Sequence, residues 1–326
     1  MKHQRKLSGI FAALGMLVLI LDSEASLLGA GEGLDLCIKT VIPSLFPFFF
    51  LSGILVQEWT GRPISFLRPL GQFLGMPEGS ESLLITGFLG GYPVGAKAVR
   101  DTWKAGSLSK KDANRLLAFC SNAGPAFLFG MAAPMLAKPQ TGWILWGIQI
   151  ISAMTVGLLH RDVPESNAAI PPQTRKSISE NLIQALMVTA QVCGWVISFR
   201  ILTTFAQRWF LWLLPRWWSV LFSGILELTN GCLSLSGIEN EKIRFILCSA
   251  LLSWGGICVV MQTASVTQGL ELSSYIRGKL LQTAFSILIS AVIVGFLPPI
   301  LLILPVVVGF GQKIVKRSSI PRPADV

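Results

Sequence analysis

One stretch of the chain decides how the rest is interpreted: Gly87-Phe-Leu-Gly-Gly-Tyr-Pro-Val-Gly-Ala-Lys-Ala-Val99. It is apolar, but its four glycines and one proline make a poor helix. Backbone groups left unpaired in lipid each cost several kcal/mol, so irregular backbone survives at membrane depth only where protein or a cavity surrounds it. The stretch therefore predicts a re-entrant hairpin over residues 83–99, whose open backbone groups a solute or ion can pair. The alternative is a close-packed face of small residues between helices.

The composition of the chain also favours a membrane protein. Of its 326 residues, 52% are hydrophobic and 13% are charged, whereas soluble domains carry about 25% charged residues. The formal net charge is +10, but the basic residues fall in short loops beside apolar segments, as the positive-inside rule expects. This distribution favours anionic lipid headgroups as a partner and argues against nucleic acid. Whether the chain forms a homo-oligomer is left open.

Apolar segments long enough to cross a bilayer recur along the sequence. Residues 116–137 and 243–266 have this length but carry polar, glycine-rich interruptions, and residues 219–233 are short and broken, which indicates a second hairpin. The sequence thus predicts an all-α polytopic membrane protein with about eight spanning helices and two re-entrant hairpins. The uninterrupted candidates are residues 7–21, 36–56, 142–159, 182–205, 280–297 and 300–315.

The basic residues predict which loops lie in the cytoplasm. Lys2, Arg5 and Lys6 place the N-terminus there, and the acidic stretch 22–35 then lies outside. If residues 83–99 re-enter rather than cross, the basic loop 100–111 also lies inside. Under this arrangement both termini are cytoplasmic.

The two halves of the chain have the same order of segments. Ile85-Thr-Gly-Phe-Leu in the first half parallels Phe222-Ser-Gly-Ile-Leu in the second. The two halves start from opposite sides of the membrane, so the sequence predicts an inverted-topology repeat with its binding site at the broken helices. The expected divisions are an extra span (1–33), a first repeat (34–160), a cytoplasmic linker (161–178), a second repeat (179–297) and a C-terminal span with a basic tail (298–326).

Candidate binding residues of the first half lie where glycine and proline interrupt the helical pattern, at residues 90–95 and 121–125. We call these interruptions breaks. Lys97 suggests a contact with an anion, or alternatively a lysine that reaches the interface from a helix end. Pro125 removes a helix hydrogen bond and Asn122 offers a donor and an acceptor there; the alternative is a simple proline kink. The candidates are Gly90, Gly91, Tyr92, Pro93, Gly95, Lys97, Ser121, Asn122, Gly124 and Pro125.

The second half has two breaks at corresponding positions, residues 227–231 and 253–256. Glu227 is its most conspicuous carboxylate within an apolar segment, and such acids usually mark an ion or proton site; the alternative is an acid at the outer interface. Arg200 is interpreted as a structural partner or as a residue that reaches the interface. The candidates here are Glu227, Thr229, Asn230, Ser253, Trp254, Gly255 and Gly256.

The sequence carries no recognisable catalytic or metal-binding motif. HExxH, GxSxG and GxxxxGK[ST] patterns are absent, as is CxxC spacing among the six cysteines. With two histidines in the chain, we expect no metal site, no cofactor and no enzymatic activity.

Four of these motifs together resemble the YlbJ-type sporulation integral membrane proteins of the nucleoside-recognition, or Gate, domain superfamily. They are GGYPVGAKAV, LLAFCSNAGP, the Glu-Leu-Thr-Asn-Gly run and LLSWGG, and the resemblance covers residues 34–296. It implies a relation to concentrative nucleoside transporter architecture, in which two hairpins (90–97 and 227–231) and two unwound helices (121–125 and 253–256) surround the substrate. It also implies a role in spore formation, in a bacterial cytoplasmic membrane or outer forespore membrane, with dipicolinate as the cargo.

These observations favour a secondary transporter of a small solute, coupled to a cation or proton. Half-helix N-termini and Lys97 favour an anion, Tyr92 and Trp254 offer ring faces to a flat molecule, and Glu227 opposes an anion unless it is neutralised. A small aromatic carboxylate such as dipicolinate is the expected cargo. The alternatives are a nucleoside transporter and a non-transporting scaffold in sporulation or envelope assembly.

Overall fold

The computed structural model describes residues 2–59, 64–136, 140–165 and 177–303, and within these ranges all regular structure is helical. The elements of the first half are α1 (Lys2–Leu21), α2 (Ser23–Leu36), η1 (Cys37–Val41), α3 (Ile42–Trp59), η2 (Ser65–Leu67), α4 (Arg68–Phe73), α5 (Ser82–Leu89), α6 (Val94–Lys104), α7 (Lys110–Leu117), α8 (Pro125–Phe127), η3 (Leu128–Ala132), η4 (Ala133–Met135) and α9 (Thr141–Leu159).

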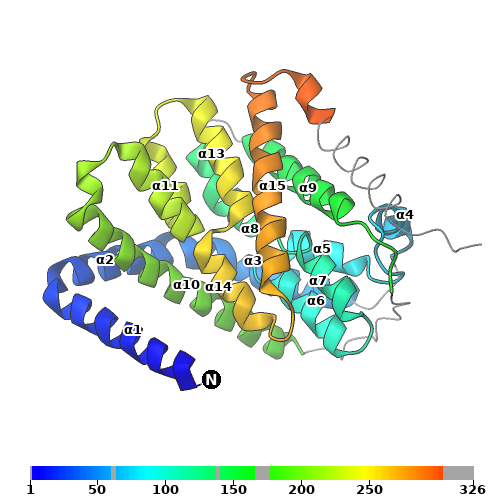
Figure 1. The fold of residues 1–326 in the computed structure, drawn as a ribbon, viewed down its shortest axis with the longest axis horizontal. Helices are drawn as coiled ribbons and strands as arrows, with labels where there is room; N and C mark the ends of the chain where they lie inside the picture. Colours follow the sequence, from blue (N-terminus) through cyan, green and yellow to red (C-terminus); the bar gives the residue numbers. More distant parts are fainter. Residues whose placement is uncertain (1, 60–63, 137–139, 166–176, 304–326) are drawn as a thin grey trace, which may run out of the picture.

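The second half begins with the long helix α10 (Figure 1). Its elements are α10 (Ile178–Trp209), η5 (Leu211–Leu213), α11 (Arg216–Leu226), α12 (Leu228–Ser234), η6 (Leu235–Gly237), α13 (Glu241–Trp254), α14 (Gly256–Val266), α15 (Leu272–Ile293) and η7 (Pro299–Ile303). The span expected over residues 300–315 lies mostly outside the described residues.

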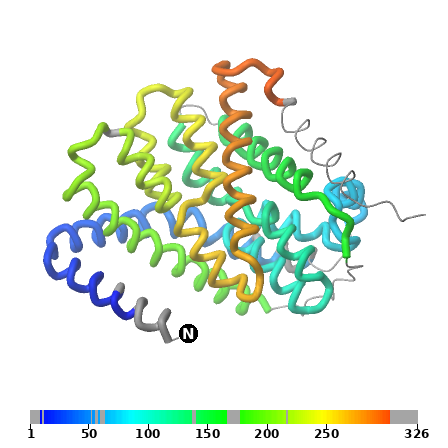
Figure 2. Tube along the Cα trace, in the orientation of Figure 1, coloured from blue at the N-terminus to red at the C-terminus, as the bar shows by residue number. Residues whose placement is uncertain are grey.

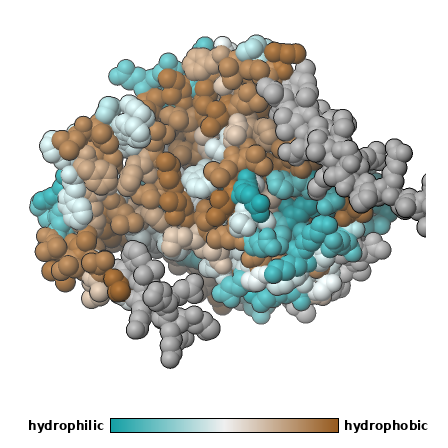
Figure 3. Space-filling model, in the orientation of Figure 1, coloured by the Kyte–Doolittle hydropathy of each residue, from teal (hydrophilic) through white to brown (hydrophobic). Residues whose placement is uncertain are grey.

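Among the described residues, five helical stretches are long and apolar enough to cross a membrane: Ser23–Leu51, Thr141–Leu159, Ile178–Trp209, Glu241–Val266 and Leu272–Ile293. Many large hydrophobic side chains on them face outward, as lipid contact requires. Figure 3 shows hydrophobic residues covering the face over α11, α13 and α15, and hydrophilic residues gathering over α6 and α7. The prediction of an all-α polytopic membrane protein is confirmed, whereas the expected eight spans remain a prediction.

The stretch 22–35, expected as an outside loop, is helical instead. Helix α2 continues through the π-helical η1 into α3, so the expected boundary at residue 34 falls inside this run of helix. Two glycines four residues apart explain the packing: a Cβ on Gly29 would lie 2.8 Å from Ile201 Cα, and one on Gly33 would lie 2.9 Å from Ile197 Cα. Such small residues let two helices approach closely. Figure 2 follows α2 and α3 alongside α10.

The acidic residues of α2 pair with basic residues of α10. Arg200 donates to Glu32 at 2.9 Å, and Arg208 donates to Glu24 at 3.0 Å. Asp22 receives a hydrogen bond from Trp209 Nε1 at 2.8 Å and also caps α2. Arg200 therefore has the structural partner that the sequence suggested as one of two interpretations.

The elements repeat in order. Helix α3, the pair α5–α6, the interrupted α7–α8 and α9 are followed by α10, α11–α12, the interrupted α13–α14 and α15. In both halves the helix pair carries closely packed glycines. A Cβ on Gly87 or Gly95 would lie 2.4 or 2.2 Å from the Cys120 carbonyl oxygen, and a Cβ on Gly224 would lie 2.4 Å from Leu251 Cδ2. Gly87 thus packs against backbone that follows α7, whereas Gly224 packs against a side chain of α13.

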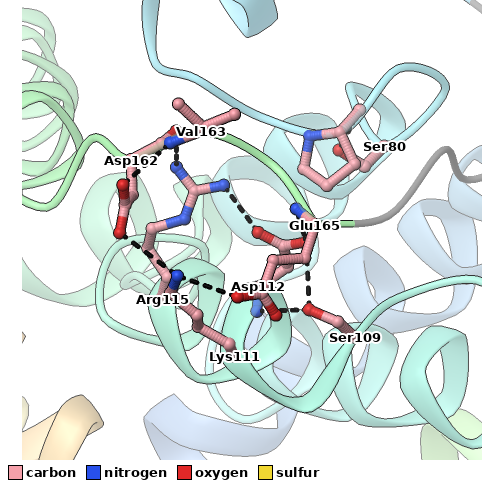
Figure 4. A network of polar contacts seen from close by, with 9 residues as sticks. Ser80, Ser109, Lys111, Asp112, Arg115, Asp162, Val163 and Glu165 are labelled. Carbon is pink, nitrogen blue, oxygen red and sulfur yellow. Dashed lines mark hydrogen bonds and ion pairs between the residues drawn. The ribbon is translucent and has the colours of Figure 1, made fainter. Parts of the chain in front are cut away.

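A polar network ties α7 to the segment after α9 (Figure 4). The buried Arg115 donates to Asp112 at 2.9 Å and to the Asp162 carbonyl at 3.2 Å, and Glu165 N donates to Asp112 at 3.0 Å. The pKa of Lys111 is raised, because its ammonium donates to Glu165 and lies beside Asp162. The network fixes α7 immediately before the break at residues 121–125.

Candidate functional site

The four breaks that the sequence marks lie together in the structure. Gly91 meets Gly124: a Cβ on Gly91 would lie 3.2 Å from the nitrogen of Gly124. The hydroxyl of Tyr92 lies within hydrogen-bond distance of the carbonyls of Leu252, at 3.3 Å, and Ser253, at 3.4 Å. These contacts join both breaks of the first half to the break between α13 and α14.

The remaining break lies between α11 and α12. Gly256, from the break between α13 and α14, contacts it. Gly255 and Gly256 both have positive φ, of 80° and 88°, which glycine adopts without strain. A Cβ on Gly256 would lie 3.1 Å from Glu227 Cα. The backbone of one break of the second half therefore rests directly on the other, and Tyr92 joins the first half to this pair.

A cavity of about 50 Å³ lies where the breaks meet. Six of the predicted residues line it: Gly90, Gly91, Tyr92, Gly124, Glu227 and Thr229. The other wall is mostly apolar and includes Phe48, Phe49 and Phe127, with Gln262 as a further polar group. A volume of this size holds only a few water molecules.

Glu227 is the carboxylate of the cavity wall, and it is 3% exposed. Its oxygens accept hydrogen bonds from the backbone nitrogens of Thr229, at 2.9 Å, and Asn230, at 2.7 Å. The side chain therefore caps α12 and satisfies its first open donors. A buried acid held in this way can take up a proton or a cation and still remain in place.

Several polar groups at the breaks are buried without a partner, although none of them lines the cavity. Among the described residues, neither side-chain polar atom of Asn230 has a hydrogen-bond partner, and the same holds for the hydroxyls of Ser121 and Ser253. All three residues are at most 1% exposed. Buried polar groups normally find partners, because leaving one unpaired costs about 1–3 kcal/mol. Their concentration at the breaks is what a polar binding site requires.

The other predicted residues shape the site or lie apart from it. Pro93 precedes α6, Pro125 begins α8, and Gly95 packs against Cys120. Lys97 forms an ion pair with Asp101 at 3.1 Å, with 43% of its side chain exposed, and does not line the cavity. Trp254 also lies outside the cavity wall and donates to the Ile225 carbonyl at 3.2 Å.

A buried polar cluster that the sequence did not reveal adjoins the site. Lys279 on α15 donates to Asn122 Oδ1 at 3.1 Å and to Gln282 Oε1 at 2.6 Å. Gln282 donates to the same Asn122 oxygen at 2.9 Å and lies 3.4 Å from the Gln149 carbonyl. Lys279 directly precedes the span expected at residues 280–297 and so looked like a terminal residue. Because α15 begins at Leu272, Lys279 lies two turns inside the helix, where an ionisable residue indicates function.

Comparison with known proteins supports a YlbJ-type family assignment. The chain is 29% identical over 144 residues to the sporulation integral membrane protein YlbJ of Bacillus subtilis (strain 168). The match covers 42% of this chain and 35% of the relative, so the matched region spans about a third of the relative's length. No protein-family model matches the chain, and no solved structure matches it.

Proposed function

We propose that this protein is a secondary transporter that moves a small anionic aromatic carboxylate, such as dipicolinate, across a bacterial membrane during spore formation. The observation that carries the proposal is the cavity walled by Gly90, Gly91, Tyr92 and Gly124 from one half and by Glu227 and Thr229 from the other. A site between two halves with matching helix breaks is the arrangement that secondary transporters use. The name of the relative supports the link to sporulation.

The chemistry of the wall favours an anion together with a neutralising partner. Helix α6 begins just after Gly91 and Tyr92, so the partial positive charge of its N-terminus lies beside the cavity, although its first nitrogens, of Val94 and Gly95, already donate to the Gly91 carbonyl. The Tyr92 ring offers an apolar face to a flat solute. Glu227 opposes an anion as long as it is ionised, and a coupling proton or cation bound there removes the repulsion. Binding of solute and of coupling ion therefore support each other.

A membrane scaffold is the alternative function, and the buried polar atoms argue against it. A scaffold needs no unpaired amide at Asn230 or unpaired hydroxyls at Ser121 and Ser253, because apolar residues of similar size pack at lower cost. In a transporter, these groups become paired in the part of the cycle when solute and water enter.

The proposal is tested by competition in proteoliposomes that contain the purified protein. We expect uptake of labelled dipicolinate, which excess unlabelled dipicolinate suppresses and which equal concentrations of uridine or a polyamine leave unchanged. If the protein takes up uridine and dipicolinate does not reduce that uptake, the protein is a nucleoside transporter and the proposal is rejected. Absence of uptake for all three solutes, with the protein inserted, would favour the scaffold.

The inverted repeat predicts opposite sidedness for two loops. Helix α15 has 22 residues and is thus about 33 Å long, about the thickness of a bilayer core. At its start Glu271 N donates to Asn114 of α7, and beyond its end Lys242 of α13 lies 5.5 Å from the ring of Phe296. The connection before α7 and the connection before α13 are therefore about one membrane thickness apart.

Cysteine labelling measures this sidedness in intact cells. With native cysteines removed, Ala105→Cys should react only from the cytoplasmic side and Glu239→Cys only from the opposite side. Both positions are exposed, so access of the reagent depends on sidedness alone. Labelling of both from one side would exclude the inverted arrangement.

A further inference from the structure

Lys279 is a buried cation without a buried anion to balance it. The residue is 0% exposed, and the two oxygens that accept from its ammonium belong to the neutral amides of Asn122 and Gln282. Within the described part of the chain no carboxylate forms an ion pair with it. Burying an unpaired charge costs several kcal/mol, and ionisable residues inside spanning helices usually have a functional partner. The missing partner is a negative charge.

One aromatic side chain separates this lysine from the cavity. The Nζ of Lys279 lies 5.3 Å from the centre of the Tyr92 ring, and Tyr92 also lines the cavity. The ring of Tyr275 lies 5.8 Å away. Asn122, which accepts from Lys279, is followed by Ala123 and Gly124, both in the cavity wall. The lysine is therefore adjacent to the site along two routes, through a ring and along the backbone.

We propose that Lys279, Asn122 and Gln282 form an inner anion site that receives a carboxylate of the transported solute when Tyr92 moves aside. This inference rests on the proposed function and assigns the charge that recognises the solute. A carboxylate oxygen replaces a neutral amide oxygen as the acceptor of the ammonium and forms a stronger, charge-assisted bond. The amide nitrogen of Gln282, which now donates to Asn122 Oδ1, supplies a donor for the second oxygen.

The hydroxyl of Tyr92 indicates how the inner site is closed. It lies 3.3 and 3.4 Å from the carbonyls of Leu252 and Ser253, at the break before Gly255. Both contacts are long for an O–H donor, whose usual distance is about 2.7–2.8 Å. A shift of the α13–α14 break therefore releases the ring at low cost and opens the passage between the cavity and Lys279.

The inner site replaces Lys97 as the source of positive charge. Lys97 is already paired with Asp101 and is partly exposed, so a solute carboxylate would gain little from it. Lys279 is unpaired by any acid among the described residues and fully buried, and an ion pair formed away from water is much stronger than one at the surface.

The test measures binding of two probes to purified protein in detergent by calorimetry. The probes are dipicolinate and its neutral diamide, which have the same ring and similar size but differ in charge. We expect the wild-type protein to bind dipicolinate tightly and the diamide weakly. Lys279→Met should weaken dipicolinate binding about 100-fold, as for loss of one partner of a buried charge pair, and leave diamide binding within about threefold of the wild type.

A second variant keeps the test decisive if Lys279→Met does not fold. Gln282→Glu is nearly isosteric and places a carboxylate on the atom that now accepts from Lys279 at 2.6 Å. This internal anion should exclude the solute carboxylate and produce the same selective loss. Lys39→Met serves as a matched control, because Lys39 lies in another spanning helix with 69% of its side chain exposed; its affinities should be unchanged.

The outcomes separate the inference from the proposed function. If either folded site variant binds dipicolinate as tightly as the wild type, the inner site is overturned while an anion transporter remains. If the wild type binds the diamide as well as dipicolinate, charge recognition is overturned with it. If the wild type binds neither probe and shows no dipicolinate uptake, both the proposed anionic cargo and the proposed inner site are rejected.

Discussion

Proteoliposomes that contain Glu227→Gln are expected to lose about 100-fold of their solute uptake, although the variant still inserts and folds. Glutamine keeps the size of the side chain and one acceptor oxygen for the backbone nitrogens of Thr229 and Asn230, so the cap of α12 is weakened rather than lost. What disappears is the negative charge in the cavity wall. A charge-assisted hydrogen bond contributes about 1.5–3 kcal/mol, and about 1.4 kcal/mol corresponds to a tenfold change. Initial uptake rates of the two proteins, at equal amounts inserted, provide the measurement.

Two comparisons separate a coupling role of Glu227 from a structural one. Glu239→Gln removes a carboxylate that is exposed near the start of α13, and it should transport at the rate of the wild type. Counterflow, which exchanges solute across the membrane without net movement of the coupling ion, should persist in Glu227→Gln if the acid binds that ion. Uptake equal to that of the wild type would remove Glu227 from the site.

The breaks could be predicted from sequence because their causes are local. Glycine and proline act on the backbone of their own segment, so the runs around Gly91, Pro125 and Gly255 can be recognised without knowledge of the fold. Their meeting around one cavity followed from the order of the segments in the two halves. Glu227 was predicted because a carboxylate in an apolar run is conspicuous.

The residues that were missed depend on contacts between distant segments. The stretch 22–35 contains four acids, which suggested a loop. Three of them, Asp22, Glu24 and Glu32, have partners that lie 168 to 187 residues further along the chain, and only the fold brings them together. Lys279 was assigned to a helix end because the apolar run begins after it. The polar residues that enclose it, Asn122 and Gln282, come from two separate elements.

Lys97 and Trp254 show the converse case. Each is a residue type that often binds solutes and each lies in a segment at the site, but neither lines the cavity. Side-chain direction in a helix depends on position within the turn, and a segment at the site carries residues on its outer face as well. Lys97 and Asp101, four residues apart, pair on the same face of α6. The spacing of four residues was sufficient to predict this ion pair, and the expectation that Lys97 contacts an anion did not take the pair into account.

Gly95→Ala is expected to lower the yield of folded protein and its melting temperature sharply, although the change adds only one methyl group. The new Cβ would lie 2.2 Å from the Cys120 carbonyl oxygen and 2.8 Å from Gly87 Cα, both backbone atoms that cannot rotate away. Relief requires α6 to move from α5 and from the break at residues 121–125, which separates Tyr92 and Gly124 in the cavity wall. Overpacking of this kind typically costs about 1–3 kcal/mol or more, a large part of a marginal stability of about 5–15 kcal/mol. The measurement is the yield of monodisperse protein in detergent and its melting temperature.

Gly147→Ala is the matched control for this prediction, since Gly147 is a helical glycine of α9 and a Cβ added there would have no other atom within 4 Å. Alanine there raises helix propensity by about 0.5–1 kcal/mol, so yield and melting temperature should equal or exceed those of the wild type. The two variants have the same composition and the same hydropathy, and they differ only in what the methyl group meets. If Gly95→Ala accumulates and melts like Gly147→Ala, then α5, α6 and Cys120 are not packed as described. The placement of Gly90, Gly91 and Tyr92 in the cavity wall would then be wrong as well.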